Sequence, residues 1–118
     1  MMKLDQVKLA IVGLGYVGLP LAVEFGKKRP VVGFDINARR VAELQSGQDH
    51  TLETEPEELS VAKHLVCTTD IEALRACNVF IVTVPTPIDR HKRPDLSALL
   101  AASRTVGRAI SKGGVVIY

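Results

Sequence analysis

Three glycines with the spacing GxGxxG join a strand pattern to a helix pattern near the start of this chain. Gly13, Gly15 and Gly18 follow the β-branched run Lys8–Val12 and begin an amphipathic segment. A sharp strand-to-helix turn favours residues without a Cβ, and the start of a helix presents unpaired N–H groups to an anion. The pattern therefore predicts a dinucleotide site, with the pyrophosphate on the main chain of Tyr16, Val17 and Gly18.

An acid follows the next strand pattern at the spacing expected for such a site. Asp35 closes the predicted strand Val31–Asp35, about 20 residues after the first glycine. A carboxylate there accepts hydrogen bonds from the adenosine ribose and repels a 2′-phosphate, which favours NAD over NADP. Arg39 and Arg40 leave an alternative open, because a nearby arginine accommodates a 2′-phosphate. They could also lie on the solvated face of the predicted helix Asn37–Ser46, which Asn37 caps.

Short apolar runs alternate with helical segments along the rest of the chain. We expect further strands over Leu65–Thr68, Val79–Val84 and Val115–Tyr118, and helices over Leu59–Lys63, Thr69–Ala76 with a Thr69/Glu72 capping box, and Leu96–Ile110 capped by Asp95. Right-handed crossovers then predict an α/β fold, a doubly wound parallel sheet of the Rossmann type with strand order 3-2-1-4-5. Because no helix follows the fifth strand, we expect residues 1–118 to be one dinucleotide-binding domain, truncated there.

Composition excludes several other classes of function. Of 118 residues, 47% are apolar, the formal net charge is +2 and only 4% are aromatic, which does not favour nucleic-acid binding. Apolar runs are too short to span a membrane and no signal peptide precedes them, so we expect a cytoplasmic protein without membrane partners. Cys67 and Cys77 lie in or beside apolar runs without metal or redox spacing and are predicted to be core residues.

Four segments together resemble a known family. They are GLGYVGLPLA at Gly13–Ala22, Asp35 with Arg40, VPTP at Val84–Pro87 and PDLS at Pro94–Ser97. In combination they are similar to the UDP-glucose/GDP-mannose dehydrogenases, the nucleotide-sugar 6-dehydrogenases. The segment GQDHTLETEPEEL at Gly47–Leu59 resembles the branch that oxidises UDP-N-acetylhexosamines for surface polysaccharide, the Vi-antigen type.

The resemblance implies a set of cofactor-binding residues. Gly13, Gly15, Tyr16, Val17 and Gly18 would hold the pyrophosphate of NAD, Asp35 and Arg40 would embrace the adenosine ribose, and Val84, Pro85 and Thr86 would border the nicotinamide ribose. The last position agrees with the residues themselves, because the fourth strand ends there at the crevice of a doubly wound sheet. Two loops stay open. Residues 90–93 either attract the anionic nucleotide sugar or form a solvated loop, and residues 50–53 either contact substrate or connect elements.

The resemblance also implies a reaction. Two NAD-dependent hydride transfers oxidise the C6 hydroxyl of a UDP-sugar, such as UDP-N-acetylglucosamine or UDP-N-acetylgalactosamine, to a uronic acid through a cysteine thioester. Its catalytic residues are expected downstream of Tyr118, so this chain alone should bind cofactor without turnover. The full-length protein is expected to be a homodimer, and the present chain could be a monomer. A nucleotide-sensing regulatory domain of a potassium-transport system is the alternative function, and a methyltransferase is disfavoured by Gly18.

Overall fold

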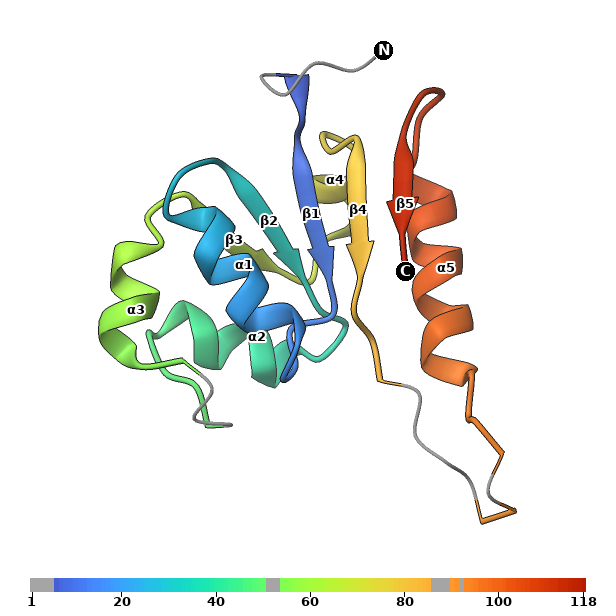
Figure 1. The fold of residues 1–118 in the computed structure, drawn as a ribbon, viewed down its shortest axis with the longest axis horizontal. Coiled ribbons are helices and arrows are strands. Elements are labelled where there is room, and N and C mark those ends of the chain that lie inside the picture. The colour runs from blue at the N-terminus through green and yellow to red at the C-terminus, as the bar shows by residue number, and fades with distance from the viewer. Residues whose placement is uncertain (1–5, 51–53, 86–89, 92) are drawn as a thin grey trace.

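Five parallel strands form the sheet of this chain, and a computed structural model describes residues 6–50, 54–85, 90–91 and 93–118 (Figure 1). In chain order the elements are β1 (Leu9–Val12), α1 (Gly18–Gly26), β2 (Val31–Phe34), α2 (Ala38–Gln45), α3 (Pro56–Val61), β3 (Leu65–Thr68), α4 (Ile71–Leu74), β4 (Val79–Val82), α5 (Ser97–Ala109) and β5 (Val115–Ile117). The strand order β3-β2-β1-β4-β5 confirms the predicted doubly wound topology.

The central strand β1 is buried on both faces, as its uninterrupted apolar sequence predicts. Leu9 and Ile11 pack against α1 and α2, whereas Ala10 and Val12 belong to the core under α4 and α5. Alternating side chains of a strand point to opposite faces, so one strand supports two hydrophobic layers. Figure 1 shows the helices placed on both sides of the sheet accordingly.

Several predicted elements have different bounds in the structure. The fourth strand ends at Val82, two residues before the predicted end, because the chain leaves the sheet ahead of Pro85, which has no N–H to donate. The helix α3 begins at Pro56 rather than Leu59, since a proline and two acids, Glu57 and Glu58, favour a helix start there.

The helix caps were predicted with mixed success. Asn37 caps α2 as expected, its side chain accepting hydrogen bonds from the N–H groups of Arg39 and Arg40. The capping box at Thr69 is wrong, because Asp70 is the N-cap of α4 and its carboxylate accepts the Glu72 N–H at 2.9 Å. The predicted Asp95 cap of α5 is also wrong, because the N-cap is Leu96, which makes no side-chain cap hydrogen bond. Asp95 lies one residue earlier, and its carboxylate accepts the N–H and the hydroxyl of Ser97.

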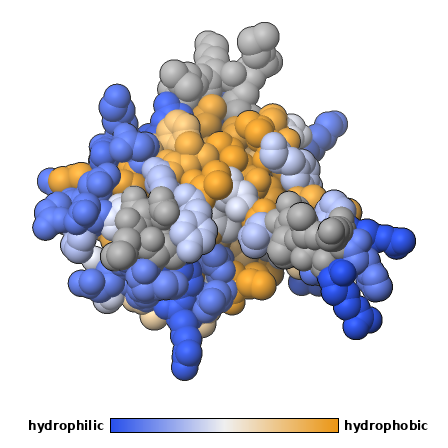
Figure 2. Space-filling view, turned by 60° about the horizontal axis from the view of Figure 1, so that its bottom comes forward, coloured by the Kyte–Doolittle hydropathy of each residue, from blue (hydrophilic) through white to orange (hydrophobic). Residues whose placement is uncertain are grey.

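All five strands run in the same direction, so their carboxyl ends lie along one edge of the sheet, at the bottom of Figure 1. Turning this edge forward in Figure 2 shows hydrophobic surface across its centre, with polar surface around it. Ligands of doubly wound sheets bind outside the carboxyl ends of the strands, where the strand order reverses. Among the described residues, no helix is both long and apolar enough to cross a membrane.

Candidate cofactor site

The glycine turn leaves β1 at this edge of the sheet. Gly13 has a φ of +103°, a conformation that residues with a Cβ rarely adopt. Its N–H donates to the carbonyl of Phe34 at the end of β2, with an N···O distance of 2.8 Å. The first glycine thus makes the tight turn that the sequence predicts.

Gly18 and Gly15 differ in what surrounds them. A Cβ added to Gly18 would lie 1.8 Å from the Gly13 carbonyl oxygen and 2.4 Å from the Thr83 hydroxyl, so the fold itself requires this glycine. A Cβ added to Gly15 would meet no described atom within 4 Å. The fold therefore gives no steric reason for Gly15, whereas a ligand that approaches the main chain closely would supply one.

The start of α1 is open to an anion. Within the described residues, the N-cap Val17 has no side-chain capping hydrogen bond, and the first turn contains no acid. Tyr16 and Val17 are 68% and 65% exposed, so neither residue is packed into the core of the domain. Unpaired N–H groups and the positive end of the helix dipole together favour a phosphate at this position.

Asp35 is held in a fixed orientation beside the turn. Its Oδ2 accepts the N–H of Leu14 at 2.9 Å, and its Oδ1 accepts the N–H of Asn37 at 2.9 Å. Each oxygen retains a lone pair for a further donor such as a ribose hydroxyl. The carboxylate, the turn and the end of β4 line one open pocket of about 300 Å³. Two larger hollows, of about 430 and 380 Å³, lie away from the glycine turn.

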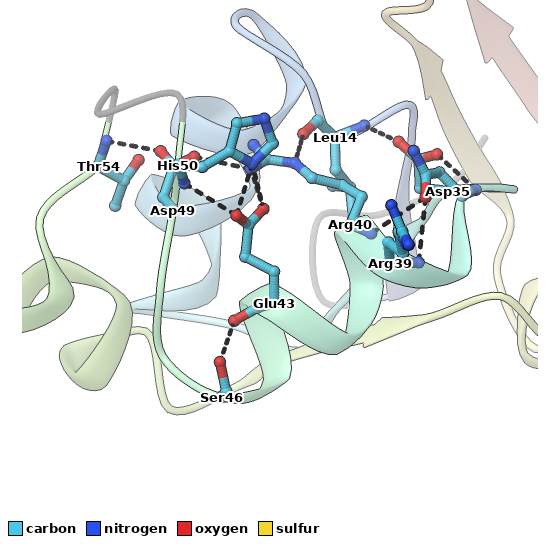
Figure 3. Close-up of polar contacts among 10 residues, drawn as sticks. Leu14, Asp35, Arg39, Arg40, Glu43, Ser46, Asp49, His50 and Thr54 are labelled. Atoms are coloured by element: carbon cyan, nitrogen blue, oxygen red, sulfur yellow. Dashed lines mark hydrogen bonds and ion pairs between the residues drawn. The ribbon is translucent and has the colours of Figure 1, made fainter.

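Arg40 is buried, so the solvated-face interpretation is wrong for this residue and holds only for Arg39, which is exposed. The Nε of Arg40 donates to the Leu14 carbonyl at 2.7 Å. Its Nη1 contacts Glu43 at 2.8 Å and Asp49 at 2.7 Å (Figure 3). Sequence periodicity alone could not show this burial, because the loop that covers Arg40 lies outside the helix pattern of α2.

The ion pairs change the acidity of the groups in this network. Burial by itself would lower the pKa of Arg40, but the hydrogen bonds to Asp49 and Glu43 outweigh it and raise this pKa above its usual value. Burial would likewise raise the pKa of Glu43, and hydrogen bonds from Arg40 and His50 bring it below its usual value. Arg40 and Glu43 are therefore both charged at neutral pH.

Two further residues lie at the pocket, and sequence reasoning assigned neither to the cofactor site. His50, for which the sequence left a substrate contact or a connecting loop open, lines the pocket beside the glycine turn, with its Nδ1 2.7 Å from Glu43 Oε1. Thr83 donates its hydroxyl to the Gly13 carbonyl at 2.8 Å and ties the end of β4 to the turn. Thr83 did carry a signal, because it is the single polar residue in the apolar run Val79–Val84.

The remaining predicted positions follow β4. Val84 is half-buried against Gly13, and Pro85 is exposed and lines the pocket. Thr86 lies outside the described residues. Arg90, His91 and Arg93 are exposed, which leaves both interpretations of the basic loop open.

The two cysteines are core residues, as predicted. Burial raises the pKa of Cys67 to about 11 and also raises that of Cys77, so neither thiol is activated as a nucleophile. Within the described part of the chain, no group of three His, Cys, Asp or Glu side chains is arranged to hold a metal ion.

Comparison with known proteins identifies the domain. Residues 7–118 match the description "UDP-glucose/GDP-mannose dehydrogenase family, NAD binding domain". The UDP-N-acetyl-D-glucosamine 6-dehydrogenase from Salmonella typhi has 56% sequence identity to this chain over the chain's whole length. The enzyme of the same name from Pseudomonas aeruginosa has 60% identity over 98% of the chain. The chain spans only 28% and 27% of these relatives.

Solved structures agree with this assignment. UDP-D-ManNAc dehydrogenase from Pyrococcus horikoshii superimposes with a TM-score of 0.81 and 36% identity over 93% of this chain and 27% of its own. GDP-mannose dehydrogenase from Pseudomonas aeruginosa superimposes with a TM-score of 0.82 and 26% sequence identity. The match covers 90% of this chain and 26% of that dehydrogenase. The dinucleotide of this fold is therefore NAD. The chain belongs to the UDP-glucose/GDP-mannose dehydrogenase family, of which it is the NAD-binding domain.

Proposed function

We propose that residues 1–118 form the N-terminal domain of a UDP-N-acetylhexosamine 6-dehydrogenase and bind NAD at the glycine turn. The observation that carries this proposal is the open space at Gly15, which the fold does not require to be glycine. An uncapped helix start and an oriented carboxylate lie beside that space. These groups fit a pyrophosphate followed by a ribose, the order in which they occur in NAD.

Each residue has a distinct part in the proposed site. The main chain of Gly13, Gly15, Tyr16, Val17 and Gly18 holds the pyrophosphate, and Asp35 accepts hydrogen bonds from the ribose. Arg40 holds the Leu14 carbonyl and thereby the turn, and its contact with the ribose stays a prediction. Val84, Pro85 and Thr86 border the nicotinamide side. Bound NAD supplies the hydride acceptor, and the domain's residues orient it toward a substrate.

The substrate is proposed from the relatives. High identity to two UDP-N-acetyl-D-glucosamine 6-dehydrogenases supports oxidation of the C6 hydroxyl of UDP-N-acetylglucosamine, or of its galactose epimer, to a uronic acid. Because the chain matches only about a quarter of the length of these relatives, we place the catalytic residues in the part of the whole protein that follows this domain. The homodimer and the cytoplasmic location also stay predictions, and nothing in the comparisons supports the potassium-transport alternative.

Binding of NADH by this chain is the direct test. Titration followed by calorimetry or NADH fluorescence should show saturable binding, which Asp35→Ala weakens about tenfold by removing the ribose acceptor, a loss of about 1.4 kcal/mol. Glu57→Ala, an exposed acid on α3, is the matched control and should leave the affinity unchanged. No NADH should form when the chain is given NAD and UDP-sugars.

Three results would contradict the proposal. Preferential binding of NADPH would overturn the role of Asp35, and UDP-sugar-dependent turnover by residues 1–118 alone would overturn the placement of the catalytic residues elsewhere. Unchanged NADH affinity in Asp35→Ala would remove the carboxylate from the site.

A further inference from the structure

A buried ion cluster stands behind the proposed NAD site. Arg40 is 6% exposed, and the side chain of its partner Asp49 is fully buried. Glu43 contacts the same Nη1 atom of Arg40 from α2, and Asp49 contacts it from the loop that follows (Figure 3). One guanidinium is thus paired with two carboxylates at the wall of the cofactor pocket.

Each of the three charged residues in the cluster makes a further contact with the surrounding chain. Asp49 also accepts the N–H of Thr54 at 3.0 Å through Oδ2, and Glu43 is contacted by the N–H and ring of His50. Arg40 reaches the glycine turn through the Leu14 carbonyl. Its Nη2 is buried and has no hydrogen-bond partner among the described residues.

The contacts of Arg40 in this cluster make its guanidinium unavailable to a 2′-phosphate. Recognition of that phosphate needs a guanidinium that presents free N–H groups, two in parallel at best. In Arg40 the Nε and Nη1 donors are already used, and the unpartnered Nη2 is buried rather than presented to the pocket. Turning the side chain outward would break the ion pair with the buried carboxylate of Asp49, which is strongly unfavourable. Arg39 is exposed and does not line the pocket beside the glycine turn.

We propose that Glu43 and Asp49 determine the dinucleotide specificity of this domain by holding Arg40 away from a 2′-phosphate. NADP is then excluded by three carboxylates, of which Asp35 repels the phosphate directly and the other two withhold Arg40. The inference rests on the proposed NAD site. It differs from the usual account of such sites, in which the single acid after the second strand decides the preference.

Dissociation constants for NADH and NADPH, measured on the same preparations, test this proposal. Glu43→Gln keeps the size of the side chain but removes one charge from the cluster. We expect the ratio of NADPH to NADH affinity to rise about tenfold in Glu43→Gln and at least as much in Asp49→Asn. Glu57→Gln, an exposed acid on α3, is the matched control and should leave the ratio unchanged.

A double variant separates release of Arg40 from simple loss of negative charge. If Arg40 is the group set free, Glu43→Gln combined with Arg40→Met should return the ratio to that of the unaltered chain. A raised ratio that persists in the double variant would overturn the proposal, because charge alone would then explain it.

The remaining outcomes are also decisive. Circular dichroism and a thermal melt establish whether each variant is folded. If Asp49→Asn does not fold, because Asp49 is buried, Glu43→Gln alone provides the test. An unchanged ratio in folded Glu43→Gln, with normal NADH binding, would overturn this inference alone. Failure of the unaltered chain to bind NADH would instead overturn the proposed function.

Discussion

At the scale of single residues, the three glycines of the turn are needed for different reasons. Gly13 adopts a positive φ, and Gly18 lies against the main chain of Gly13. Gly15 has neither constraint within the described structure. A side chain at Gly18 would therefore disturb the fold, whereas a side chain at Gly15 would occupy only the space assigned to the cofactor.

The paired variants Gly15→Ala and Gly18→Ala separate these roles. Gly18→Ala should lower the free energy of unfolding by about 3 kcal/mol, because its Cβ overlaps a main-chain oxygen that cannot move freely. Gly15→Ala should change it by less than about 1 kcal/mol yet weaken NADH binding more than tenfold. Urea unfolding and NADH titration of both variants provide the measurements. Equal loss of stability in both would show that Gly15 is structural.

At the scale of elements, short helices in this fold depend on their first residues. The helix α4 spans only Ile71–Leu74, too short to be stable by its own hydrogen bonds. Asp70 accepts the N–H of Glu72, and the Asp70 N–H in turn donates to the Thr68 hydroxyl at 3.0 Å. The cap links the end of β3 to the helix, and Leu74 is then buried in the core under α4 and α5.

Asp70→Ala should lower the free energy of unfolding by about 1 kcal/mol, the usual effect of removing a helix cap. Thr69→Ala is the matched control at the neighbouring position and should have an effect below about 0.5 kcal/mol. Chemical denaturation of the two variants distinguishes them. If Thr69→Ala had the larger effect, the capping box read from the sequence would be right and the observed cap wrong.

At the scale of the whole molecule, burial in the hydrophobic layers around the sheet changes how a thiol group responds to pH. Cys67 lies in the layer that contains α1 and α2, and burial raises the pKa of its thiol from 9.0 to about 11. The folded chain keeps this proton at a pH where the unfolded chain has lost it. Its contribution to stability is therefore complete below pH 9 and is lost as the pH rises toward 11.

Cys67→Ala should remove this part of the pH dependence. We expect the free energy of unfolding of the unaltered chain to fall by about 2 kcal/mol more than that of the variant between pH 9 and 11. Denaturant titrations of both proteins at a series of pH values provide the comparison, in which other titrating groups cancel. Parallel curves for the two proteins would show that the folded thiol ionises normally.

Much of this architecture follows from local patterns in the sequence. Strand order follows from parallel strands joined by right-handed crossovers, and Asn37 caps α2 through contacts only two and three residues away. The boundaries of α3 and β4 were predicted less well, because a proline and the departure of the chain from the sheet determine them.

The sequence by itself determined the sheet, the position of the glycine turn and the acid that favours NAD, since each depends on residue types at short, regular spacings. Only the tertiary structure showed that Arg40 is buried between two carboxylates and that Thr83 holds Gly13, a contact between residues 70 positions apart. Periodicity reports which face of an element is apolar, but it carries no information on which loop will cover that face. The charges that surround the cofactor pocket are therefore a property of the folded chain.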